Sequence, residues 1–128
     1  PMDFSDFKAL GLDIRKDYTP LKYAKGYDHC FCLDGPNGEL REACVLRSPK
    51  SRRRVTVLTD QPGVQIYTGN YLAGSPANMA GRSYEDYEGV AMEAQGLPDS
   101  PNHASFPSPR ISADAPYSRT IVYHFDTF

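Results

Sequence analysis

Short stretches in which apolar and polar residues alternate recur along the chain, and they predict β-strands. In the clearest of them, Val64 and Ile66 share one face while Gln65 and Tyr67 share the other. The same pattern predicts about six strands in all, at residues 27–33, 40–46, 55–59, 64–68, 90–95 and 120–125. No apolar run approaches the ~20 residues that a membrane-spanning helix needs.

Glycine and proline separate these stretches, since the chain holds ten glycines and 11 prolines. Residues 34–38 and 48–51 have the composition of turns, because Gly and Asn tolerate positive φ and Pro restricts φ. We expect the first of these turns to join the strands at 27–33 and 40–46 into a hairpin. Residues 72–88 and 98–109 are predicted to be long loops.

The first 25 residues show no alternation, and they are predicted to be irregular apart from one helical turn. This turn covers residues 7–14, with Asp6 as its N-cap, and Pro20 opposes its extension. No repeat or linker divides the chain. Short strands and tight turns with little helix therefore predict an all-β fold, an antiparallel β-sandwich, in a single domain over residues 1–128.

Composition narrows the classes of partner. The chain is 40% hydrophobic and carries a formal net charge of −2, which is typical of a globular protein with no overall attraction to nucleic acid or acidic membranes. Its only run of like charge is the arginine triplet at residues 52–54, which is expected to be a solvated entry to a strand. We therefore expect neither nucleic acid nor a membrane as a partner.

Three cysteines, an odd number without the spacing of a disulfide framework, predict reduced thiols in a cytoplasmic protein. Cys30 and Cys32 would share one face of a strand, which raises the possibility of a metal site. Because no second pair of ligands accompanies them and zinc usually takes four, we expect buried structural thiols and no metal.

Glu93 stands in the middle of the predicted strand at 90–95. Val90 and Met92 would lie on its apolar face, and Ala91, Glu93 and Gln95 on the other. A carboxylate in this position is either a surface residue of a half-buried strand or a base held rigidly at a binding surface.

Four segments resemble the C-terminal part of the galactose mutarotases, or aldose 1-epimerases. They are residues 1–4 (Pro-Met-Asp-Phe), 26–29 (Gly-Tyr-Asp-His), 62–72 (Pro-Gly-Val-Gln-Ile-Tyr-Thr-Gly-Asn-Tyr-Leu) and 90–103 (Val-Ala-Met-Glu-Ala-Gln-Gly-Leu-Pro-Asp-Ser-Pro-Asn-His). The resemblance runs from Pro1 to about Phe125. It implies a portion of a large β-sandwich, and an enzyme that interconverts the α and β anomers of galactose or glucose without a cofactor.

The resemblance also implies residue roles. The family's base is a glutamate in the context Glu-x-Gln-x-x-Pro-Asp-x-x-Asn, which Glu93 and the residues after it reproduce. Asp28 and Gln65 occupy positions where the family binds sugar hydroxyls. The alternative for Asp28 is a turn residue beside Gly26, and from the residues alone Gln65 would be a plain exposed strand residue.

Minor positions are interpreted in the same way. Tyr67 shares the face of Gln65 and is expected to wall the pocket, and Asn70 is expected to hold the loop that follows it. The residues 52–54 replace the glycine-containing turn that the family usually has, which affects the local turn and not the site.

No residue of the chain is assigned as the general acid. The family's acid histidine and a second, assisting histidine lie upstream of Pro1, and His29, His103 and His124 are interpreted as structural or exposed residues. We therefore expect residues 1–128 alone to be inactive, and to associate with another copy or with a complementing N-terminal portion. The alternative function is a non-catalytic carbohydrate-binding or structural β-sandwich.

Overall fold

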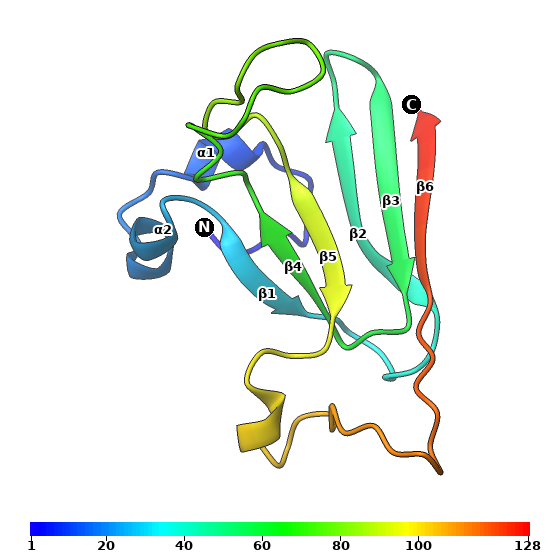
Figure 1. Ribbon diagram of the computed structural model, residues 1–128. Helices are drawn as coiled ribbons and strands as arrows, with labels where there is room; N and C mark the ends of the chain where they lie inside the picture. The colour runs from blue at the N-terminus through cyan, green and yellow to red at the C-terminus, as the bar shows by residue number, and fades with distance from the viewer. The chain divides into compact units, whose positions relative to one another are not determined.

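The computed structural model describes residues 1–128 and consists mainly of short strands (Figure 1). The strands, in chain order, are β1 (Asp28–Cys32), β2 (Arg41–Ser48), β3 (Arg53–Thr59), β4 (Gly63–Tyr67), β5 (Ala91–Gln95) and β6 (Ile121–Thr127). Two short helices, α1 (Leu10–Asp13) and α2 (Thr19–Ala24), precede them, and a 3-10 turn, η1 (Ser100–Asn102), follows β5. All six predicted strands are confirmed, with bounds that differ by a few residues.

The strands form two three-stranded sheets, with strand orders β1-β4-β5 and β2-β3-β6. Both pairings of the second sheet, β2 with β3 and β3 with β6, are antiparallel. No helix is both long and apolar enough to cross a membrane. The predicted all-β, antiparallel, two-sheet class is therefore confirmed.

The predicted hairpin between the first two strands is wrong, because β1 and β2 belong to different sheets. Eight residues, 33–40, separate them, whereas hairpin loops usually have two to five. The polar groups of this connection bond elsewhere: Gly38 N donates to Asp60 O at 3.0 Å, and Arg41 Nε donates to Asp34 O at 2.7 Å. The hairpin lies one strand later, where residues 49–52 join β2 to β3.

The N-terminal segment also differs from expectation. α1 is shorter than residues 7–14, and its N-cap is Ala9, not Asp6. α2 lies where an irregular segment was predicted. Pro20 stands in its first turn, where a helix tolerates the missing N–H. α2 ends at Ala24, and its C-cap Lys25 has a left-handed conformation, with Gly26 N donating to Leu21 O at 2.9 Å.

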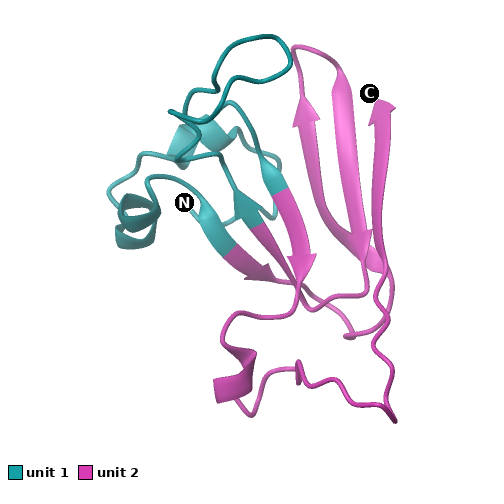
Figure 2. Ribbon diagram, in the orientation of Figure 1, with its two compact units in different colours: residues 1–29, 66–91 teal, residues 30–65, 92–128 magenta.

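Two compact units share the chain, as Figure 2 shows. Unit 1 comprises residues 1–29 and 66–91, and unit 2 comprises residues 30–65 and 92–128. The boundaries between them fall inside β1, β4 and β5, so each of these strands contributes residues to both units. The single domain over residues 1–128 stays a prediction.

Unit 1 has a small core built around Tyr27 and Leu21, whose side chains are buried. The ring of Phe4 meets Tyr27 edge-on, with centroids 5.2 Å apart. Beside them Asp13 is buried and forms ion pairs with Lys16 at 2.6 Å and Lys8 at 2.9 Å. Hydrogen bonds from Lys16 and then Lys8 lower the pKa of Asp13 to about 2, so the carboxylate stays charged down to strongly acidic pH.

Unit 2 packs around Val57 of β3 and Val64 of β4, both buried. The Oγ1 of buried Thr59 donates to Thr120 O at 2.9 Å, which attaches the entry of β6 to the end of β3. Gly63 allows close packing between β4 and the Cys30 side chain of β1. A Cβ at this position would lie 2.8 Å from Cys30 Sγ and 3.0 Å from Leu97 Cδ2.

We predict that Gly63→Ala destabilises the protein by ~1–3 kcal/mol, because the added methyl group would overpack a site with no room for it. Urea denaturation would measure the change in the free energy of unfolding. Gly96→Ala is the matched control, since nothing lies within 4 Å of a Cβ there, and its effect should stay within about 0.5 kcal/mol. Equal stabilities of the two variants would contradict this account of the packing.

Candidate functional site

The three candidate residues lie on the three strands of the β1-β4-β5 sheet. Asp28 is the first residue of β1, Gln65 is central in β4, and Glu93 is central in β5. Asp28 and Glu93 are exposed, and Gln65 is half-buried. The strand interpretation of the segment around Glu93 is therefore confirmed, while the roles of the three residues stay predictions.

Contacts inside unit 2 show which side chains share a face of this sheet. The side chain of Gln95 hydrogen-bonds the Cys30 thiol, and Gly63 lies directly beside the same sulfur. Because side chains alternate along a strand, Gln65 lies on the face of Gly63, and Glu93 on the face of Gln95. Gln65 and Glu93 therefore project from the same face of neighbouring strands β4 and β5.

The same alternation places Asp28 on the Cys30 side of β1 and His29 on the opposite side. The backbone N–H of Asp28 donates to His29 Nδ1 at 3.0 Å, so the half-buried imidazole is engaged by its neighbour's backbone. An interpretation of His29 as a packed residue agrees with this contact.

Buried hydrogen bonds in unit 1 hold the residue that precedes Asp28. Thr68 N donates to Tyr27 O at 3.0 Å, and Tyr27 N donates to Thr68 Oγ1 at 3.1 Å. Asn70, which is fully buried, donates from Nδ2 to Ala24 O at 2.8 Å and to Tyr27 O at 2.9 Å. These bonds hold the backbone of Ala24 and Tyr27, directly before β1, in a defined position.

Asn70 thus holds the turn before β1, a role that the sequence did not predict. Gly26 makes room for it: its φ is 148°, and a Cβ there would lie 2.4 Å from Asn70 Oδ1. Any larger residue would both strain the backbone and displace the amide. The signal was present in the sequence as the glycine two positions before Asp28, but its partner lies 44 residues further along the chain.

Tyr67, the predicted wall of the pocket, is half-buried and shares the strand face of Gln65 by alternation. Its hydroxyl accepts a hydrogen bond of 3.1 Å from Tyr71 N, which anchors the start of the long loop after β4. Its contact with a sugar stays a prediction.

The loop after β5 carries the remaining residues of the Glu-x-Gln-x-x-Pro-Asp-x-x-Asn context. Asp99 has a left-handed backbone with φ of 60°, and its carboxylate accepts from Asn102 Nδ2 and lies 3.1 Å from His103 Nε2. The His103 ring stacks on Phe106, with centroids 4.8 Å apart. Asp99 therefore organises the loop that follows Glu93, and His103 belongs to the same local structure.

Two of the three thiols, Cys30 and Cys44, are half-buried and suited to packing. Cys32 is exposed, so the prediction of buried thiols is wrong at this position. All three cysteines are free. Burial, with a contribution from neighbouring Cys32, raises the pKa of Cys30, and burial raises the pKa of Cys44 to about 11. Both thiols are therefore protonated at neutral pH and poorly nucleophilic. No group of three or more His, Cys, Asp or Glu side chains is arranged to hold a metal ion.

Comparison with known proteins identifies similar sequences over nearly the whole chain. A family model described as aldose 1-epimerase matches residues 1–124. An aldose 1-epimerase of Escherichia coli (strain K12) is 34% identical over 125 residues, which cover 96% of this chain and 36% of that protein. A galactose mutarotase of Bos taurus is 36% identical over 128 residues, 96% of this chain and 37% of that protein.

A third relative, an aldose 1-epimerase of Haemophilus influenzae, is 48% identical over 101 residues, which cover 77% of this chain and 28% of that protein. The chain thus spans about a third of the length of the relatives it matches.

Proposed function

The chain belongs to the aldose 1-epimerase family, and we propose that the protein interconverts the α and β anomers of D-galactose or D-glucose by acid–base opening of the sugar ring. The observation that carries the proposal is the common face of Gln65 and Glu93 on adjacent strands of a sheet whose sequence matches this family. A carboxylate and an amide on one rigid surface suit a polyhydroxylated, uncharged ligand.

Glu93 is the proposed base. Its carboxylate is exposed at the centre of β5 and belongs to none of the ion pairs of the chain, so it is available to a ligand. In the proposed reaction it removes the proton from the anomeric hydroxyl while an acid protonates the ring oxygen, and the ring opens and recloses on either face. The step needs neither a cofactor nor a metal.

Asp28 and Gln65 are the proposed sugar-binding residues. A carboxylate accepts two hydroxyl hydrogen bonds at once, and an amide both donates and accepts, so each group is suited to binding sugar hydroxyls. The buried bonds of Asn70 support the proposal for Asp28, because they hold the backbone directly before it. A cytoplasmic location belongs to the same proposal and rests on the three free thiols.

We predict that, in the full-length protein, Glu93→Gln lowers the rate of mutarotation about a hundred- to ten-thousandfold while sugar binding is largely kept, since the amide retains the shape but accepts no proton. Polarimetry on freshly dissolved α-D-galactose measures the rate. Glu42→Gln, which changes an exposed carboxylate near the start of β2, is the matched control and should turn over like the parent. A Glu93→Gln protein with the parent's rate would disprove the assignment of the base.

Asp28→Ala should instead weaken the binding of galactose by ~1.5–3 kcal/mol, the usual loss for a hydrogen bond to a charged group. Titration calorimetry measures the affinity, and thermal unfolding checks that the entry of β1 is intact. Unchanged affinity would show that Asp28 is only a turn residue beside Gly26.

Residues 1–128 by themselves should show no mutarotation, because they contain the proposed base and two sugar contacts but no residue assigned as the acid. They should also associate: β6 is an edge strand, and its Ile121, Tyr123 and Phe125 side chains are exposed. Light scattering and polarimetry on the isolated chain test both points. An active monomer would show that His29, His103 or His124 supplies the acid. The non-catalytic carbohydrate-binding alternative is favoured instead if the full-length protein binds galactose without mutarotation.

A further inference from the structure

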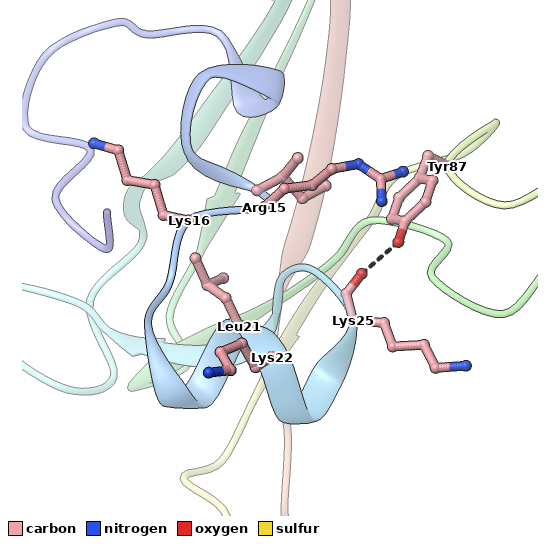
Figure 3. A pocket seen from close by; sticks show the side chains of 7 residues that line it. Arg15, Lys16, Leu21, Lys22, Lys25 and Tyr87 are labelled. Atoms are coloured by element: carbon pink, nitrogen blue, oxygen red, sulfur yellow. Dashed lines mark hydrogen bonds between the residues drawn. The ribbon is translucent and has the colours of Figure 1, made fainter.

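A cavity of about 260 Å³ lies within unit 1, between α2 and the segment that precedes it (Figure 3). It is lined by Ile14, Arg15, Lys16, Leu21, Lys22, Lys25 and Tyr87. None of these residues is a candidate for the sugar site. Its volume is slightly below the ~300–1,000 Å³ of pockets for drug-sized ligands, so it suits a smaller molecule.

The interior of the cavity is apolar. Leu21 is 1% exposed, and in Figure 3 its side chain extends from α2 toward the segment that carries Arg15 and Lys16. Ile14 and the ring of Tyr87 add further apolar surface. A small hydrated ion has no apolar surface to bury against these walls. A ligand with an apolar body would bury such surface and gain hydrophobic binding energy.

Four cationic side chains surround this apolar interior, and two of them are already neutralised. Lys16 pairs with Asp13 at 2.6 Å, and Lys22 pairs with Asp17 at 2.8 Å. Arg15 and Lys25 take part in none of the ion pairs of the chain. The lining therefore has two positive charges without a protein counterion.

Arg15 is held in a defined orientation at the edge of the cavity. Its guanidinium carbon lies 4.9 Å from the centroid of the Tyr87 ring. That ring is fixed in turn, because Tyr87 Oη donates to Lys25 O at 2.6 Å and Tyr87 N donates to Gly69 O at 2.8 Å. A guanidinium stacked on an aromatic ring keeps its planar fork of donors free for a phosphate.

We propose that this cavity binds a phosphomonoester that has a small apolar or ring-shaped body. A phosphomonoester carries a charge of about −1.5 to −2 at neutral pH, which matches the two uncompensated cations, and its phosphate can accept two parallel bonds from Arg15. Lys25 now lies 4.8 Å over the Tyr71 ring, and its flexible stem lets the ammonium turn toward the phosphate. Such a ligand differs in charge from the neutral sugar of the proposed reaction, so this is a second site.

Calorimetric titration of the protein with phenyl phosphate tests the proposal, because this probe combines a phosphate dianion with an apolar ring and lacks the hydroxyls of a sugar. We expect saturable binding of one molecule per chain. Arg15→Gln should weaken it about ten- to a hundredfold, the range for losing a charge-assisted hydrogen bond. Arg110→Gln, an exposed arginine in unit 2, is the matched control and should bind like the parent.

Two further probes separate the contributions of charge and of the apolar body. Inorganic phosphate should bind at least tenfold more weakly than phenyl phosphate, and benzoate, a monoanion, more weakly as well. The absence of saturable binding, equal losses in Arg15→Gln and Arg110→Gln, or tighter binding of either comparison probe would overturn the proposal. In the full-length protein, Arg15→Gln should leave the rate of mutarotation unchanged, and Glu93→Gln should leave the affinity for phenyl phosphate unchanged, so the two proposed sites are tested independently.

Discussion

The buried amide of Asn70 is the interaction on which the entry to the candidate site depends. It donates to two backbone carbonyls, Ala24 O and Tyr27 O, and accepts from the Thr68 hydroxyl at 2.6 Å. A buried carbonyl without a partner costs ~1–3 kcal/mol, so these bonds leave the chain little freedom in the turn between α2 and β1. Gly26 is required because this amide occupies the space of a Cβ. Asp28 therefore follows a backbone segment whose path is strongly restrained.

Strand alternation then divides the β1-β4-β5 sheet into two faces with different chemistry. On β4, buried Val64 belongs to one face, and Gly63 and Gln65 belong to the other. The Cys30 thiol lies beside Gly63 and is hydrogen-bonded by Gln95 on this second face in unit 2. Gln65 and Glu93, at the centres of β4 and β5, lie on the same face. The close packing at Gly63 is therefore part of the same sheet face as the proposed base, Glu93. A polar side chain on a well-packed strand is held in a defined position for a ligand.

The two proposed binding sites use opposite electrostatic designs. The sheet face offers single carboxylates and an amide, which recognise hydroxyl groups through directional hydrogen bonds. The cavity beside α2 has an apolar lining and four cationic side chains, of which only Lys16 and Lys22 pair with a carboxylate. This combination favours an anion with an apolar body. The first site draws its order from strand pairing. The second depends on Tyr87, whose ring lies against Arg15 and whose hydroxyl bonds the end of α2.

Local pattern was sufficient for some features of the protein and insufficient for others. The alternation of apolar and polar residues determined the six strands, and the motifs around Asp28, Gln65 and Glu93 determined the family, because both are properties of neighbouring residues. Tertiary structure decided the pairing of β2 with β3 instead of β1, and the formation of a second helix with Pro20 in its first turn, where only an irregular segment was predicted. It also decided the joining of Arg15, Lys25 and Tyr87 around one cavity, across a separation of 62 residues between the last two. The periodicity of a sequence shows which face of a segment is apolar. Which other segment packs against that face depends on hydrogen bonding and packing between parts of the chain that are far apart in sequence.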